Sequence, residues 1–232
     1  MYNYKEKRLS AMIEFESIYQ KELSELDKII DLNIDLFSSL CNNNEEFIRK
    51  NIEFTFLILR SVDYYISAIY LLKQRAFFET LSIIRLSIET SSAAIHLQNN
   101  PLEYEKYKAG KFKSTTSISY AKNLIEGFDK FWGILSHTAV HTNILQGARK
   151  NNDKYYSCST PFLNIGNKDL SPDLDMYIIL NLNISGNIIY RCFQLLVAKD
   201  LSIDDINKIS PASRETVEKL NNLFIVLNLF KH

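Results

Sequence analysis

The sequence contains little glycine, proline or cysteine. Its 232 residues include only 6 Gly and 4 Pro, and so few helix-breaking residues favour long helices over many short strands. The three cysteines, Cys41, Cys158 and Cys192, are far apart and match no metal-binding spacing, which indicates a reduced, cytoplasmic setting. Lys and Arg together make up 27 residues, and Asp and Glu together also make up 27. No net charge therefore draws the whole chain to nucleic acid or to acidic membranes.

The sequence also lacks the segments that mark membrane proteins and several enzyme classes. Its N-terminus is polar and has no apolar run of the signal-peptide kind. Residues 54–72 and 176–198 are apolar, but both carry charged or amide side chains near the middle, which are costly at the centre of a bilayer. We therefore expect buried helices and no membrane partner. No nucleophile elbow, phosphate-binding loop or dinucleotide fingerprint occurs, and no cofactor is expected.

Amphipathic helical patterns fill most of the chain. Hydrophobic residues make up 46% and charged residues 23%, as in a soluble globular protein long enough for one substantial core. The sequence predicts a single all-α domain over residues 1–232, a bundle of about six or seven helices. The predicted segments are an N-terminal helix at about 9–40, core helices within about 45–145 and 172–199, a C-terminal helix at about 211–230, and an irregular loop or small hairpin near 146–170. The first of the core helices is expected to run from about 45 to 73.

Local signals predict some of the helix ends. Asn100, Pro101 and Glu103 have the form of a helix start with a capping box. The pattern weakens over Ser114–Ser119, which predicts a loop or a break between two helices. The next helix, at about 119–145, is expected to kink at one of its glycines, Gly127 or Gly133.

The stretch 76–98 carries two lines of side chains. An apolar line at steps of three and four contains Phe77, Leu81, Ile84, Ile88 and Ile95. A second line contains Arg85, Glu89, Ser92 and His96, and apolar residues border it. Burying Arg and Glu is costly unless they are paired or hydrogen-bonded. This helix is therefore either the polar spine of a core or one wall of a site.

A second notable segment is 131–143, FWGILSHTAVHTN. His137 and His141 are four residues apart, so they share a helix face. If this helix faced the Arg85–Glu89 line, a guanidinium, a carboxylate, the Ser136 hydroxyl and imidazoles would gather at one place.

Two interpretations of these residues stay open. In the structural one, Arg85 and Glu89 form an ion pair and His141 is a packed histidine. In the functional one, Arg85 binds a phosphate or carboxylate, Glu89 orients it, and His141 is a general base. Further substrate-binding candidates are His137, His96 and Arg60, which is also spaced to pair with Asp63.

A metal site and a nucleic-acid site are further alternatives. His137 and His141 could supply two zinc ligands and Glu89 a third. However, Thr-Ala-Val separates the two histidines, so the glutamate of the zinc-binding motif HExxH is missing. We therefore assign no metal. A basic and aromatic cluster fits either a nucleic-acid surface or a solvated helix face; it contains Tyr104, Lys106, Tyr107, Lys108, Lys111 and Lys113.

The R-x-x-x-E helix with Arg85 and Glu89, followed by an "LS…VH" helix, resembles uncharacterised bacterial all-α proteins related to the HEPN superfamily. The resemblance covers about residues 52–143, and its second part is formed by Leu135, Ser136, Val140 and His141. It implies a helical bundle that forms a homodimer. It also implies a role in stress or phage defence, either as a ribonuclease or toxin-type effector acting on RNA or as a non-catalytic domain that binds a partner protein.

This chain departs from the RNase signature of that superfamily, an Arg followed four to six residues later by a His on one helix. No such pair occurs, so it stays open whether the protein is an enzyme. A metal-independent RNase site would have to form across helices, with Arg85 stabilising the phosphate, His141 taking the proton from a ribose hydroxyl and Glu89 orienting one of them. The alternative is a non-catalytic protein–protein or ligand-binding domain in which these residues form a structural network, and the balanced net charge favours it.

Overall fold

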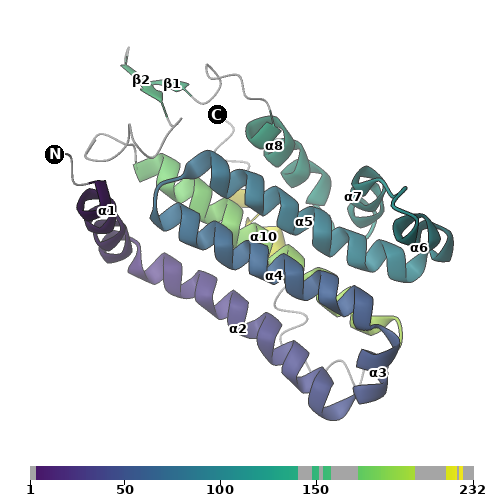
Figure 1. Cartoon of the computed structure of the whole chain (residues 1–232). Coiled ribbons are helices and arrows are strands. Elements are labelled where there is room, and N and C mark those ends of the chain that lie inside the picture. The colour runs from purple at the N-terminus through teal and green to yellow at the C-terminus, as the bar shows by residue number, and fades with distance from the viewer. Residues whose placement is uncertain are drawn as a thin grey trace.

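The protein is all-α, as the sequence predicts (Figure 1). The computed structural model describes residues 4–140, 148–151, 154–157, 172–201, 218–223 and 225–226. Its helices are α1 (Tyr4–Ile18), α2 (Gln20–Asn43), α3 (Glu45–Lys50), α4 (Ile52–Lys73), α5 (Phe77–Asn99), α6 (Pro101–Lys108), α7 (Ser114–Lys122), α8 (Phe128–Val140) and α10 (Pro172–Ala198). Residues 218–223 and 225–226 are also helical.

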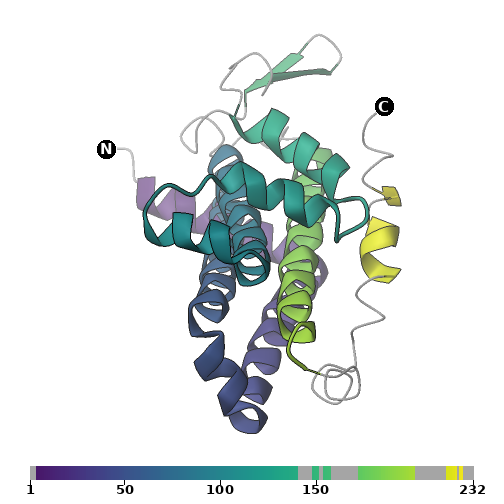
Figure 2. The same cartoon turned by 90° about the vertical axis from the view of Figure 1, so that its right-hand side faces the viewer.

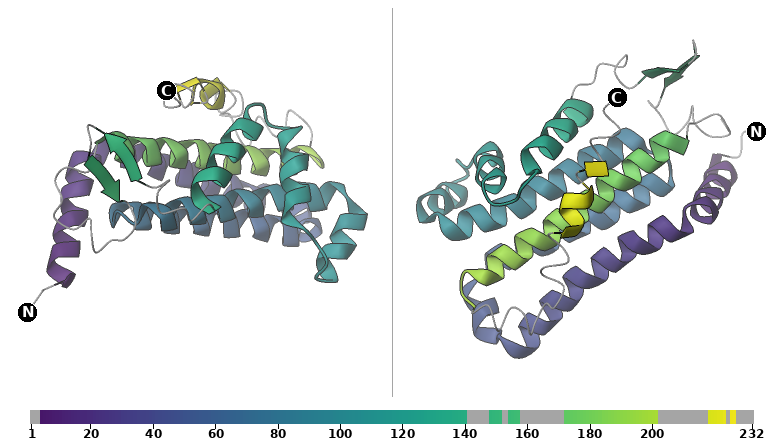
Figure 3. Two further views of the ribbon diagram at one scale, coloured as in Figure 1. Left: turned by 90° about the horizontal axis from the view of Figure 1, so that it is seen from above. Right: turned by 180° about the vertical axis from the view of Figure 1, so that it is seen from behind.

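Helix α5 is the centre of the fold. It packs against α4 and α10 on one side, while α6, α7 and α8 form a further layer over it (Figure 2). Helix α2 runs along α4 and α10, and α1 lies across one end of the bundle (Figure 3). The predicted apolar line of α5 is buried throughout, with 0–5% exposure at Phe77, Leu81, Ile84, Ile88 and Ile95. Its second line faces α7 and α8, so α5 has neighbours on both faces.

Two long helices expected from the sequence are each divided by a residue that contacts α10 or the residues after it. The helix expected at 9–40 separates at Tyr19 into α1 and α2, and the Tyr19 hydroxyl donates to Asp175 of α10. The helix expected from 45 to 73 separates at Asn51 into α3 and α4, and the Asn51 amide donates to Asp200. No glycine or proline lies at either point, so the sequence does not mark the breaks and only the tertiary structure shows them.

The start of α6 combines a correct prediction with a wrong one. Pro101 is its first residue, as predicted. The capping box does not form, because the Asn100 amide donates to the His96 carbonyl at 2.9 Å and so caps the end of α5 instead. Glu103 pairs with Lys106 at 2.6 Å.

The break expected over Ser114–Ser119 is wrong, because these residues begin α7. Ser117 and Ile118 are buried, and α7 packs on α5. The chain turns instead before α7, at Gly110 (φ +67°), and before α8, at Gly127 (φ +78°), where a positive φ favours glycine. Gly127 is thus a break, as expected, whereas Gly133 lies inside α8.

The irregular region expected near 146–170 contains a small hairpin. Strand β1 (Ala148–Asn151) pairs antiparallel with β2 (Lys154–Ser157), with Ala148 opposite Ser157. Elsewhere, α4 is the one helix in the described parts of the chain that is long and apolar enough to cross a membrane by length and composition. Because 44% of its apolar window is buried in the bundle, core packing accounts for much of that composition.

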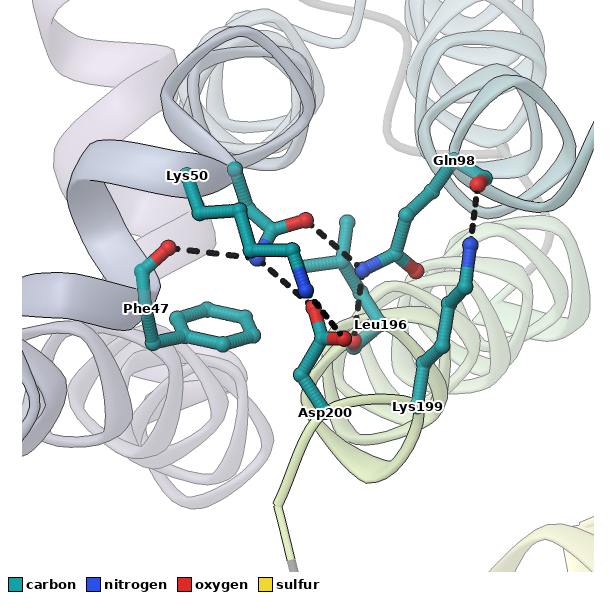
Figure 4. A network of polar contacts seen from close by, with 7 residues as sticks. Phe47, Lys50, Gln98, Leu196, Lys199 and Asp200 are labelled. Carbon is teal, nitrogen blue, oxygen red and sulfur yellow. Dashed lines mark hydrogen bonds and ion pairs between the residues drawn. The ribbon is translucent and has the colours of Figure 1, made fainter. Parts of the chain in front are cut away.

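A polar network ties the ends of α3, α4, α5 and α10 together (Figure 4). The Gln98 amide nitrogen donates to Asn51 Oδ1 and to the Leu196 carbonyl, both at 3.0 Å. Asn51 and Lys50 both donate to the carboxylate of Asp200, each at 2.9 Å. The Asn51 amide also reaches the Phe47 carbonyl, and Lys199 donates to the Gln98 carbonyl. Buried polar groups in this network are thus largely paired, as a low-dielectric interior requires.

Candidate functional site

The two segments singled out in the sequence face each other. Helix α8 packs on α5, and the Arg85 guanidinium lies over the Trp132 ring, with its carbon 5.0 Å from the ring centroid. Phe128, one turn earlier on α8, stacks on Trp132 at 6.5 Å between centroids. Arg85 is therefore held between its own helix and an aromatic wall.

Arg85 and Glu89 form the ion pair that both interpretations require. Arg85 Nε lies 2.9 Å from Glu89 Oε1, and the side chains are 26% and 20% exposed. Only Nε is used, so the two Nη atoms have no hydrogen-bond partner within the described part of the chain. These atoms are the ones that present a guanidinium fork to a phosphate or carboxylate. Glu89 thus fixes Arg85 without occupying its outer face.

Ser136 lies one turn beyond Trp132 on the same helix. Its Oγ is buried, and it has no hydrogen-bond partner among the residues that the structure describes. A buried hydroxyl without a partner costs free energy, so this atom is available to a ligand or to a water. His137 belongs to α8, but its side chain lies outside the described residues, as does all of His141. The contribution of both histidines stays a prediction.

His96 does not join Arg85. The two residues are eleven positions apart on α5, about 16 Å along the helix axis. His96 is 7% exposed, its Nδ1 lies 3.1 Å from Ser117 Oγ, and its ring stacks on Tyr120 at 4.9 Å. Burial lowers the pKa of His96, which favours the neutral ring. It therefore packs α5 against α7, and Ser92 Oγ between the two sites is buried without a partner in the described residues.

Arg60 is an exposed side chain of α4. Its guanidinium carbon lies 4.8 Å from the centroid of the Tyr64 ring. The ion pair expected with Asp63 is not formed within the described chain, because the guanidinium stacks on the aromatic ring of the next turn instead. The partners of Arg85 are Glu89 and Trp132, and Arg60 is not among them.

The basic and aromatic cluster of α6 is partly neutralised. Lys106 pairs with Glu103 and Lys108 with Glu105, each at 2.6 Å. Lys108 also lies over the Tyr104 ring, 4.6 Å from its centroid, and the Tyr104 hydroxyl donates to Glu53 of α4. These contacts give the cluster a role within the fold. Among the residues that the structure describes, no group of three His, Cys, Asp or Glu could hold a metal ion.

A second cluster, which the sequence did not reveal, lies where α1 meets the α4–α5 turn and α10. The Tyr19 hydroxyl donates to Asp175 Oδ2 at 3.0 Å, and Arg75 Nη2 lies 3.9 Å from the same oxygen. Burial raises the pKa of the Asp175 carboxyl. Arg75 has a φ of +56°, which is strained for a residue with a side chain.

This cluster is incompletely paired. Asp175 Oδ1, Arg75 Nε and Gln74 Oε1 are buried without a partner in the described residues. Because Tyr19 and Arg75 both contact Asp175 of α10, we assign the cluster to the fold. The one unusual local feature of this cluster is the positive φ of Arg75, and a φ angle cannot be read from the sequence.

No protein-family model, curated protein or solved structure matches the chain.

Proposed function

We propose that this is a HEPN-like helical protein of bacterial stress or phage defence that acts in the cytoplasm on RNA. The observation that supports the proposal is the state of Arg85. Its Nε is fixed by Glu89 and its face by Trp132, while both Nη atoms remain without a partner in the described residues. An arginine held in this way is preorganised to bind a phosphate.

Trp132 and Ser136 fit the same ligand. An aromatic ring offers a surface on which a base can stack without sequence preference, and the hydroxyl of Ser136 can donate to a phosphate oxygen. The partial burial of the Arg85–Glu89 pair, with 26% and 20% exposure, strengthens charge interactions relative to open solvent. The site thus combines one cation, one aromatic ring and one hydroxyl.

In the catalytic form of this proposal, His141 is the general base. It takes the proton of a ribose 2′-hydroxyl, whose oxygen attacks the adjacent phosphorus while the bond to the 5′-oxygen breaks and that oxygen takes up a proton. The products are a 2′,3′-cyclic phosphate and a 5′-hydroxyl, and no metal is needed. Arg85 stabilises the charge that develops on the phosphate, and Glu89 holds Arg85 in position.

A second candidate function is a non-catalytic helical domain that binds a partner protein or a small ligand. The Arg85–Glu89 contact favours it, because an i, i+4 pair neutralises its own charge. The balance of 27 basic and 27 acidic residues favours it too, since proteins that bind RNA usually carry a basic footprint.

The experiment is an RNA-cleavage assay on the purified full-length protein, with and without EDTA. It compares the wild type with Arg85→Ala, Arg85→Lys and His141→Ala. The matched control is Arg49→Ala, which removes an exposed arginine of α3. Circular dichroism confirms that each variant is folded, and the product ends are analysed for cyclic phosphate.

We expect cleavage that survives EDTA, yields cyclic phosphate ends, is retained by Arg49→Ala, and falls at least about 100-fold in Arg85→Ala and His141→Ala. Arg85→Lys should recover little, because lysine lacks the planar fork and the stacking face. Retained cleavage in Arg85→Ala would contradict the assignment of the site. Absence of cleavage in every form would leave the binding domain as the better proposal.

A further inference from the structure

Helix α4 exposes a continuous line of apolar side chains. The largest members are Phe56 and Tyr70, which are 61% and 58% exposed, and Ile52 and Ile66 are 43% and 42% exposed. Leu59 and Asp63 complete the line. We name these six residues the α4 stripe: Ile52, Phe56, Leu59, Asp63, Ile66 and Tyr70.

The stripe lies on the side of α4 that faces away from the bundle. Its members follow one another at alternating steps of four and three, which keeps them on one face of a helix. The opposite face carries the residues buried in the core, among them Ile58, Tyr65 and Leu72. A single exposed apolar residue is ordinary, but a line of them along a whole helix marks an interaction surface.

The stripe is symmetric about Ser61. Ile52 and Tyr70 lie nine positions to either side of it, Phe56 and Ile66 five, and Leu59 and Asp63 two. In an antiparallel pairing of two copies about a two-fold axis at this level, Ile52 therefore meets the partner's Tyr70, Phe56 meets the partner's Ile66, and Leu59 meets the partner's Asp63. Such an interface uses the same patch on both subunits.

The charges at the centre also fit a second copy. Arg60 borders the stripe and Asp63 belongs to it, and the two do not pair with each other within one chain. In the antiparallel arrangement, the Arg60 side chain of each copy lies beside the partner's Asp63. Two symmetric ion pairs then form between the copies. A bilayer would have no counterpart for these charges, which makes a lipid surface the poorer occupant.

We propose that the α4 stripe is the interface at which two copies of this chain form an antiparallel two-fold dimer. The proposal is independent of any action on RNA, because Arg85 lies on α5 and contacts α8.

The area available suits a dimer of modest stability. At about 200 Å² for a whole aromatic residue, Phe56 and Tyr70 at 61% and 58% exposure offer roughly 480 Å² over two copies. The two isoleucines, Leu59 and the polar residues beside them bring the total to about 1,000–1,200 Å², at the lower end of specific interfaces. We therefore expect association that depends on concentration.

The first test is sedimentation velocity of the full-length protein over about two orders of magnitude in concentration. The wild type should shift from monomer to dimer, and Phe56→Glu should remain monomeric. The matched control is Leu102→Glu, at an apolar residue of α6 that is 80% exposed and lies outside the stripe; it should dimerise as the wild type does. Both substitutions replace exposed side chains, so neither should unfold the protein.

A charge exchange tests the arrangement itself. Arg60→Asp alone and Asp63→Arg alone place like charges together in a homodimer, and each variant should be monomeric. The double variant should dimerise again, and a mixture of the two single variants should form a heterodimer. A wild type that is monomeric throughout overturns the proposal. A dimer that persists in Phe56→Glu would also overturn it. A third refuting result would be a monomeric wild type that binds anionic vesicles, with this binding abolished in Phe56→Glu.

Discussion

Gly186 lies where α10 crosses α4 and α2, and we expect Gly186→Ala to destabilise the protein. A Cβ at this position would lie 2.7 Å from Ile29 Cγ2 and 2.7 Å from both Cζ and Oη of Tyr65. Ile29 and Tyr65 are each 1% exposed, so neither side chain can move away into solvent. The new methyl group therefore forces a shift of α10 or of its neighbours.

Two opposing effects set the magnitude. Replacing glycine by alanine inside a helix normally stabilises by about 1 kcal/mol. Overpacking a closed core costs about 1–3 kcal/mol, and occasionally more, and contact with three atoms places this site at the upper end. We expect a net loss of about 1–2 kcal/mol, or roughly 2–8 °C in Tm for a chain of this length.

The assay is urea unfolding followed by circular dichroism, with Gly133→Ala as the matched control. Gly133 is also inside a helix, and nothing lies within 4 Å of the Cβ it would gain, so this variant should be more stable than the wild type. Tyr65→Phe removes a hydroxyl that has no partner among the described residues, and in the double variant it should reduce the cost of Gly186→Ala. If Gly186→Ala proved as stable as Gly133→Ala, the packing of α10 on Tyr65 described above would be wrong.

Two further predictions concern the ends of the bundle. Gln98→Ala leaves Asn51 Oδ1 and the Leu196 carbonyl without their donor. It should lower the free energy of unfolding in urea by about 2–4 kcal/mol. The control Asn99→Ala, at an exposed neighbouring residue, should lower it by less than about 1 kcal/mol. Burial raises the pKa of Asp175 above its unfolded value of 3.8, so the folded protein binds a proton there more readily than the unfolded chain. Between the unfolded and the folded pKa of Asp175, the wild type should therefore gain stability relative to Asp175→Asn as the pH falls. Unfolding curves measured from neutral pH to about pH 4 check this prediction. A loss of stability relative to Asp175→Asn on acidification would refute it.

Periodicity and composition were enough to identify the helical class and the central helix. The apolar line of α5 is buried as expected, because a spacing of three and four leaves only one face for the core. The starts at Pro101 and Pro172 also agree with the sequence, since proline suits the first turn of a helix. The resemblance to HEPN-like proteins, the action on RNA and the roles of His137 and His141 remain predictions.

The sequence did not show where the long helices break or which partner some of the polar side chains choose. The helices separate at Tyr19 and Asn51, whose side chains bond to Asp175 and Asp200, more than 140 positions away. Arg60 was expected to pair with Asp63 and instead stacks on Tyr64, a choice between two neighbours that helical spacing alone does not make.

The sequence by itself determined which residues share a helix face, because that depends only on the 3.6-residue turn. Only the tertiary structure decided which faces meet. It brought Arg85 to Trp132, placed His96 against Ser117 instead, and left the α4 stripe exposed. The physical reason is that packing between helices is set by the shapes of all the side chains at once, so it cannot be obtained from any one segment.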